Sequence, residues 1–301
     1  MATITQAFHD FMLRLELTPA EQAEASRQHN ELRDRIRGRL GGVQRDLIVG
    51  SYARRTAIRP LNDIDLFLVL DPQVHRDRHD KTPGHILDRL QSALRVCYER
   101  PGPAIRIQGR SVNIEFSGTG IGYDLIPAFA LNSTSAADPD DMVYEIPDRE
   151  RAAWIQTNPA RHRRRCVEAN ERAGAMLNRL IKAAKHWNRS HREGNGDKPL
   201  RSFHLEAMCY EAFSTTPADE RRGLHALFGH LASRVLTQCP DPAGLSPHLD
   251  AGIGPEHRQR VHHKLRAAEL VTREAVRHEE RGDDAAACRC WGAVLGEPFR
   301  S

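Results

Sequence analysis

The chain has no long hydrophobic run, and this absence limits where it can work. In its 301 residues, no apolar run approaches the roughly 20 residues that a membrane-spanning helix needs. The first residues, MATITQAFHDFMLRLEL, are amphipathic and lack the apolar core of a signal peptide. We therefore expect a cytoplasmic protein with no membrane partner.

The sequence also lacks a cysteine framework. Its six cysteines are scattered without the paired spacing of a zinc site, and a chain of this length does not need disulfides for stability. Only Cys288-x-Cys290 approaches a metal motif, and no second pair accompanies it. We expect all six to be reduced and most of them to be buried.

A strong charge of one sign is missing as well. Lys and Arg total 44 against 40 Asp and Glu, which gives a formal net charge of +4. This mild surplus suits an anionic small ligand such as a nucleotide, and it falls short of a surface dedicated to nucleic acid. The basic run RHRRR at 161–165 is typical of a solvated helix face, with contact to phosphate or a partner as the alternative.

Two kinds of pattern divide the chain near residue 150. Thr18-Pro19-Ala20-Glu21 predicts a capped helix start, followed by a long polar helix that ends near Gly41-Gly42. Short apolar segments then predict strands, with one helix, GHILDRLQSALRVCYER, after the second: RDLIVG, IDLFLVL, AIRIQ, SVNIEF and GYDLIPAF. Residues 132–159 have the composition of a connecting stretch.

Later helices are expected near 161–193, 203–214, 220–237, 255–281 and 283–295. The fold class predicted is α+β. Residues 1–150 would form a mixed sheet with helices, including an N-terminal spine helix, and residues 151–301 would form a helical domain.

Two aspartates stand one residue apart at the head of an apolar strand, in GSYARRTAIRPLNDIDLFLVL. Alternate residues of a strand share a face, so Asp63 and Asp65 project side by side while Ile64 faces the other way. Like charges this close repel unless a cation lies between them, and Mg²⁺ fits better than zinc because no histidine or cysteine joins the pair. A solvated turn at a strand start is the alternative for an isolated D-x-D.

Neighbouring segments supply further groups for phosphate chemistry. Gly50-Ser51 follows a short strand and precedes YARR, which offers a flexible glycine, a hydroxyl and free backbone N–H groups to a phosphate. Asp124 lies inside the apolar pattern GYDLIPAF, where aspartate is normally disfavoured. The glycine-rich SGTGI predicts a hairpin that brings Asp124 beside the first pair. Three carboxylates around two Mg²⁺ ions suit phosphoryl transfer to a hydroxyl.

With these motifs together, the chain resembles the nucleotidyltransferases of the DNA polymerase β-like superfamily. More narrowly, it is similar to the bacterial CD-NTases, cyclic-oligonucleotide synthases related to cyclic GMP-AMP synthase and oligoadenylate synthase. Three further segments carry the resemblance over nearly the whole chain: LIKAAKHWNR at 180–189, LRSFHLEAM at 200–208 and HEERGDDAAACRCWGAVLGEPF near the end. It implies a polymerase β-like mixed sheet followed by an α-helical C-terminal domain.

The resemblance implies a role for each motif residue. Gly50 and Ser51 would hold triphosphate oxygens. Asp63 and Asp65 would ligate both Mg²⁺ ions, and Asp124 would complete the site of the ion beside the attacking hydroxyl. Mn²⁺ can substitute for Mg²⁺. In these roles the three aspartates are both the catalytic and the metal-binding residues.

Three more substrate contacts are implied in the helical half. Lys185 and Ser202 would contact the triphosphate, and Phe203 would stack on a base. Considered alone, these residues also fit a surface lysine, a helix cap and a core aromatic. Other candidates for a phosphate contact flank the Gly50-Ser51 turn: Arg54, Arg55 and Arg59.

The implied activity is synthesis of a cyclic di- or trinucleotide second messenger from nucleoside triphosphates, with ATP first among them. The family context is bacterial anti-phage (CBASS) signalling, in which the product activates a separate effector. Some relatives in the family are regulated by a HORMA-type partner or through modification of the C-terminus, for which the tail EPFRS is the candidate here, and the sequence leaves open whether this chain uses either. The zinc insertion of the animal DNA sensor is missing from this sequence, so sensing of double-stranded DNA is not expected.

Other functions remain open at this point. One is a template-independent nucleotidyltransferase that acts on RNA or protein, and another is a linear oligoadenylate synthase. A catalytically inactive scaffold is a third, and the retention of all three aspartates argues against it because converging carboxylates are costly without a function.

Overall fold

The computed structural model describes residues 3–98, 102–131, 142–194 and 196–296. The chain divides into two units, each with its own packing. The sheet unit comprises Leu17–Arg55 and Pro60–Arg163, and the helical unit comprises Met1–Glu16, Thr56–Arg59 and Arg164–Ser301. This division differs from a single boundary near residue 150, because the first helix and a four-residue segment after Arg55 pack with the later helices.

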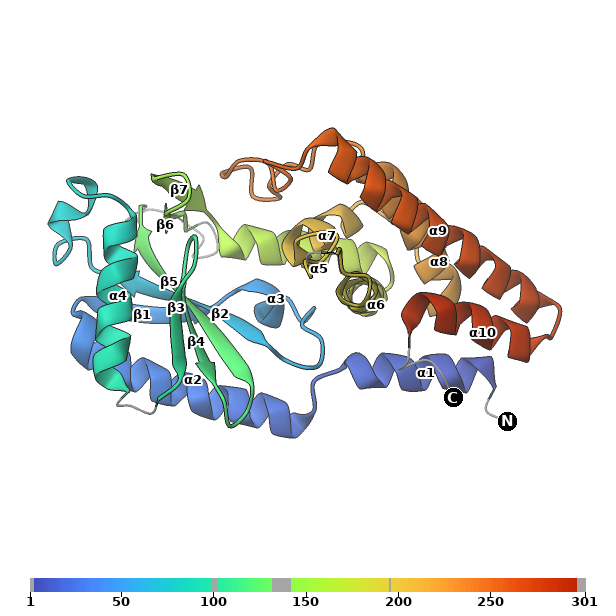
Figure 1. The fold of residues 1–301 in the computed structure, drawn as a ribbon, viewed down its shortest axis with the longest axis horizontal. Coiled ribbons are helices and arrows are strands. Elements are labelled where there is room, and N and C mark those ends of the chain that lie inside the picture. Colours follow the sequence, from blue (N-terminus) through green and yellow to red (C-terminus); the bar gives the residue numbers. More distant parts are fainter. Residues whose placement is uncertain (1–2, 99–101, 132–141, 195, 297–301) are drawn as a thin grey trace. The chain divides into compact units, whose positions relative to one another are not determined.

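The sheet unit is built on one mixed sheet (Figure 1). Among the described residues the strand order is β1-β2-β5-β4-β3, and β6 pairs with both β5 and β7. Strands β2 and β5 are parallel, whereas the other pairs are antiparallel. The strands are β1 (Val43–Ile48), β2 (Asp63–Leu70), β3 (Ala104–Ile107), β4 (Val112–Phe116), β5 (Ile121–Ala130), β6 (Tyr144–Asp148) and β7 (Ala153–Thr157). The five strands predicted from the sequence are confirmed.

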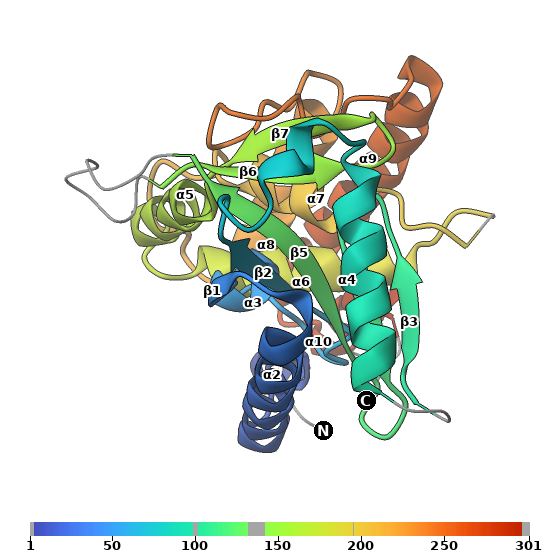
Figure 2. The ribbon, with the colours of Figure 1, turned by 90° about the vertical axis from the view of Figure 1, so that its left-hand side faces the viewer.

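Helices cover one face of this sheet (Figure 2). They are α2 (Pro19–Leu40) and α4 (Gly84–Cys97). The Tyr123 hydroxyl of β5 donates a hydrogen bond to the Ala25 carbonyl of α2, so this face includes Tyr123 and its register partner Ile64. The predicted capping box of α2 is confirmed, since Thr18 and Glu21 bond each other's backbone N–H groups. The unit also contains the short helix α3 (Gly50–Ala53) and a 3-10 turn (Arg76–His79).

The prediction that residues 132–159 form a connecting stretch is wrong for the second half of this range. Residues 144–157 form the β6–β7 hairpin, because alternating apolar residues there have a surface to cover. Tyr144, Ile146 and Ile155 pack with Phe67 and Val69 on the face opposite the helices. Residues 132–141 lie outside the described residues.

The helical unit contains six complete helices among the described residues, and α5 (Pro159–Arg172) enters it from the sheet unit. Its core includes the buried rings of Phe8, Phe11, Trp187 and Trp291. The complete helices are α1 (Ile4–Leu15), α6 (Leu177–Ser190), α7 (Ser202–Cys209), α8 (Glu220–Arg234), α9 (Pro255–Glu280) and α10 (Asp284–Leu295). None of the described helices has the length and apolarity that spanning a bilayer requires.

The single helix expected at 161–193 is two helices. Gly174 and Ala175 both adopt left-handed backbone angles, with φ of 60° and 64°, and two such residues in succession end a right-handed helix. The Asn170 side chain accepts a hydrogen bond from the Asn178 N–H at the start of α6. The six cysteines are free thiols, and Cys166, Cys209 and Cys239 are buried.

Candidate active site

Strand register brings the predicted carboxylates together in the sheet unit. In the parallel pair β2–β5, Asp65 lies opposite Asp124 and Asp63 lies opposite Gly122. In the antiparallel pair β4–β5, Asn113 lies opposite Asp124. Because paired residues of neighbouring strands share a face, Asp65, Asp124 and Asn113 form one polar row across three strands. This row lies on the face that α2 and α4 leave uncovered.

Asp124 carries the clearest electrostatic signature of the row. Burial raises its pKa to about 6, with the charges of Asp65 and Asp63 adding to the rise. Hydrogen bonds from Asn113 and Ser111 act in the opposite direction, and the Asn113 amide nitrogen lies 3.1 Å from Asp124 Oδ1. A carboxyl group with this pKa is held in a site where more negative charge is unfavourable and positive charge is favourable.

The carboxylate oxygens of this row are of the kind that Mg²⁺ accepts as ligands. Nowhere in the described part of the chain do three His, Cys, Asp or Glu side chains already form a group that could hold an ion. Mg²⁺ is commonly bound by one or two carboxylates together with substrate phosphates rather than by an all-protein cage. The raised pKa of Asp124 beside Asp65 and Asp63 fits such a site.

The Gly50-Ser51 turn lies directly against Asp65. Gly50 has a φ of 65°, and a Cβ atom at this position would lie 1.7 Å from Asp65 Oδ2 and 2.6 Å from its Cγ. The preceding residue, Val49, donates its N–H to the Asp65 carbonyl at 2.9 Å. Only glycine therefore allows the turn to pass this close to the carboxylate, which joins the predicted phosphate site to the predicted metal site.

Sequence reasoning missed two residues of this face. Asn113 is buried on β4, and its position opposite Asp124 depends on a register that no local pattern reports. A signal was present, since SVNIEF places an amide inside an apolar strand. Gly122 was also missed. A Cβ atom there would lie 2.8 Å from the Asn62 carbonyl oxygen and 2.9 Å from Asp63 Oδ1.

The other three predicted residues belong to the helical unit, apart in sequence from the carboxylates. Lys185 is buried on α6, and its ammonium group lies 2.6 Å from Glu206 Oε2. The N-cap residue of α7 is Arg201 and Ser202 is the first residue of the helix, and Phe203 is half-buried. The alternatives of a surface lysine and a helix cap are therefore wrong.

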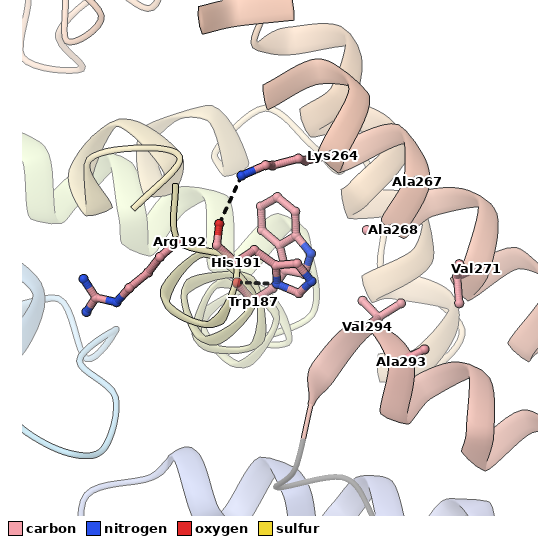
Figure 3. A pocket seen from close by; sticks show the side chains of 9 residues that line it. All are labelled: Trp187, His191, Arg192, Lys264, Ala267, Ala268, Val271, Ala293 and Val294. Atoms are coloured by element: carbon pink, nitrogen blue, oxygen red, sulfur yellow. Dashed lines mark hydrogen bonds between the residues drawn. The ribbon is translucent and has the colours of Figure 1, made fainter. Parts of the chain in front are cut away.

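The helical unit also contains a pocket of about 290 Å³ between α6, α9 and α10 (Figure 3). Trp187 and His191 stack in its wall with ring centroids 5.0 Å apart. Lys264 donates to the His191 carbonyl and to the Glu193 carboxylate, so its charge is matched locally. None of the predicted site residues lines this pocket.

Comparisons with known proteins identify the family of the chain. Residues 1–170, more than half of the chain, match the family described as the Second Messenger Oligonucleotide or Dinucleotide Synthetase domain. A cyclic AMP-AMP-AMP synthase of Acinetobacter is 24% identical over 99% of this chain and 85% of its own length. A probable cyclic nucleotide synthase of Bacillus cereus is 24% identical over 84% of this chain and 81% of its own length.

Solved structures share the fold over the whole chain. CdnC of Escherichia coli with ATP has a TM-score of 0.71 at 19% identity and covers 100% of this chain and 99% of its own. DncV, the cyclic AMP-GMP synthase of Vibrio cholerae, has a TM-score of 0.75 at 14% identity over 98% and 96% of the two chains. This chain therefore belongs to the second messenger oligonucleotide or dinucleotide synthetases, the bacterial CD-NTases, and is a nucleotidyltransferase with their polymerase β-like fold.

Proposed function

We propose that this enzyme joins nucleoside triphosphates into a cyclic di- or trinucleotide in a reaction that depends on Mg²⁺. The observation that carries the proposal is the row of Asp65 and Asp124 on adjacent strands, with Asp63 beside it and the Gly50 turn packed against Asp65. The relatives named cyclic AMP-AMP-AMP synthase and the solved complex of CdnC with ATP favour ATP as a substrate.

Asp63, Asp65 and Asp124 would hold two Mg²⁺ ions together with the substrate phosphates, and Mn²⁺ can take their place. When bound, the ions would supply charge neutralisation for the departing pyrophosphate and make the attacking ribose hydroxyl more acidic. The chain's own part is orientation. The Asn113 amide holds Asp124 Oδ1 in place, while Gly50 would let backbone approach a phosphate beside Asp65.

Contacts of the triphosphate with Ser51, Lys185 and Ser202, and stacking of a base on Phe203, stay predictions from the family resemblance. For Lys185 the prediction has a condition. A lysine ammonium has three donor hydrogens, and its contacts with Thr56 O, Thr56 Oγ1 and Glu206 already account for three. Contact with a phosphate would require it to give up one of these partners.

The cellular setting is also part of the proposal. Anti-phage (CBASS) signalling in the cytoplasm, with an effector that responds to the product, is the setting that the family implies. One solved relative is a complex of CdnC with a HORMA protein, which supports a HORMA-type regulator for this chain. The alternative regulator, the tail EPFRS, lies outside the described residues. We expect no dependence on double-stranded DNA.

The test is to incubate the purified protein with the four ribonucleoside triphosphates and Mg²⁺, treat the mixture with phosphatase, and analyse it by mass spectrometry. A phosphatase-resistant product of cyclic mass is expected, together with its loss in Asp63→Ala/Asp65→Ala. A linear, phosphatase-sensitive product would instead identify a linear oligonucleotide synthase. Pyrophosphate release that requires added RNA or protein would identify an acceptor of that class and overturn the proposal.

A further inference from the structure

A four-residue segment links the Gly50-Ser51 turn to the core of the helical unit. After α3, the chain leaves the sheet unit at Thr56 and returns to it at Pro60. Thr56 and Ile58 are buried, and Ile58 belongs to the helical core. The far end of the segment is held through the backbone of Arg59. Its N–H donates to the Leu15 carbonyl at 3.1 Å, and its carbonyl accepts from the Arg189 guanidinium at 3.1 Å.

The near end of the segment is held by a buried network of charged and polar groups. The Lys185 ammonium donates to the Thr56 carbonyl at 3.1 Å and to the Thr56 hydroxyl oxygen at 3.2 Å. The Thr56 hydroxyl in turn donates to Glu206 Oε2 at 2.9 Å. The other carboxylate oxygen, Oε1, accepts from the Tyr210 hydroxyl at 3.0 Å. Both polar groups of Thr56 named here are thus bonded within the helical unit.

Stability alone does not account for this arrangement. Lys185 is 6% exposed and Glu206 is fully buried, and a buried ion pair is often no more stabilising than apolar residues of the same volume. What an ion pair adds is a unique geometry, because its remaining donors and acceptors must also be satisfied. Here those remaining bonds go to Thr56, so the pair selects one position for that backbone.

We propose that the Lys185–Glu206 pair is an anchor for Thr56 that positions the Gly50-Ser51 turn for nucleotidyl transfer, with Glu206 as a positioning residue. The inference rests on the proposed function. Five residues separate Gly50 from Thr56, and they are bonded internally, since Arg54 N–H donates to the Gly50 carbonyl and Arg55 N–H to the Tyr52 carbonyl. Because the five residues are few and hydrogen-bonded to one another, a displacement of Thr56 would also displace the Gly50-Ser51 turn.

The test compares three variants of the full chain. Thr56→Val keeps the volume and both charges of the pair but removes the hydroxyl, whereas Thr56→Ser restores it. Thr272→Val removes the hydroxyl of another buried threonine, which bonds the Glu269 carbonyl within α9 and does not belong to the network around Thr56, so it is the matched control. For each variant, kcat and KM for ATP are measured by pyrophosphate release, hydrogen exchange of the amides at 51–55 is followed without nucleotide, and thermal unfolding is recorded.

Thr56→Val is expected to raise KM about five- to tenfold, the effect of losing one buried hydrogen bond, and to speed amide exchange at 51–55. The KM values of Thr56→Ser and Thr272→Val are expected to stay within about twofold of the parent, and the effect of Thr272→Val is confined to the melting temperature. The proposal is overturned if Thr56→Val lowers the melting temperature as Thr272→Val does but leaves both KM and exchange unchanged.

Two further outcomes are distinguishable. If the parent protein itself releases no pyrophosphate, the proposed function fails, while exchange at 51–55 still decides whether the anchor exists. If Thr56→Val does not fold, the double variant Lys185→Met/Glu206→Met takes its place, because apolar replacement of both charges is compatible with folding. Faster exchange at 51–55 in that variant supports the anchor, and unchanged exchange refutes it.

Discussion

Asp124→Asn is predicted to make the metal-free protein more stable while it abolishes nucleotidyl transfer. In the folded protein, burial and then the neighbouring charges of Asp65 and Asp63 raise the Asp124 pKa from its ordinary 3.8 to about 6. A shift of about two pKa units corresponds to about 3 kcal/mol of unfavourable free energy for the ionised group. An amide has no charge to bury, and its oxygen can still accept the hydrogen bond from Asn113.

The pH dependence follows from the sign of the shift. Between about pH 4 and pH 6 the folded state binds more protons at Asp124 than the unfolded state does, so the parent loses stability as pH rises through this range. The Asp124→Asn variant has no carboxyl group to ionise at this position, so it does not lose stability in this way. The difference in unfolding free energy between variant and parent should therefore be near zero at pH 4 and reach about 1–3 kcal/mol above pH 6.5.

The assay is urea unfolding followed by circular dichroism, in EDTA, at several pH values from 4.5 to 8. Asp34→Asn is the matched control, because the Asp34 side chain is 66% exposed on α2 and its replacement should change stability by no more than about 0.5 kcal/mol. A variant at Asp124 that is less stable than the parent at pH 7.5, or a difference that does not change with pH, would refute the reasoning.

Three more predictions concern the same site and use pyrophosphate release as the measurement. Gly50→Ala should lower activity at least about 100-fold, because its Cβ would collide with the Asp65 carboxylate and its φ is 65°. The control is Gly118→Ala, where nothing lies within 4 Å of the added atom, and its activity should stay within about twofold of the parent. Equal activities of the two variants would contradict the close approach of Gly50 to Asp65. Asn113→Ala should raise the pKa of Asp124 further, because the hydrogen bond from Asn113 lowers that pKa. In a profile of kcat/KM against pH, the acid limb should therefore move to higher pH. An acid limb that does not move would show that Asp124 is not the titrating group. EDTA should abolish turnover and either Mg²⁺ or Mn²⁺ should restore it, whereas turnover that persists in EDTA would exclude the two-ion proposal.

Local patterns were sufficient to predict most of the sheet unit. Apolar alternation identified its first five strands, and the D-x-D spacing alone predicted that Asp63 and Asp65 share one face of the sheet. The β4–β5 hairpin that carries Asp124 followed from one further step, because a glycine-rich turn between two strand patterns predicts a hairpin. These inferences succeeded because each depends on residues close together in the sequence.

The features that could not be predicted depend on packing between distant segments. Nothing local to α1 indicates that Phe8 and Phe11 pack with helices near the other end of the chain. The 144–157 segment was read as a connection because its apolar residues gain their partners, Phe67 and Val69, only in the folded sheet. Likewise, Lys185 resembles a surface lysine until Glu206, 21 residues later in the sequence, is placed beside it.

The repeated passage of the chain between its two units determines the order in which the protein can fold during synthesis. All seven strands of the described sheet are made before residue 164. Helix α1 precedes these strands in the chain, yet Phe8 meets Trp291 of α10, with ring centroids 5.1 Å apart. On the ribosome, Phe11 can meet His186 of α6 first, with ring centroids 5.5 Å apart in the folded protein, whereas the part of α1 that packs against α10 gains its partner only when α10 has been made, so an interrupted translation product keeps that part exposed to chaperones and proteases.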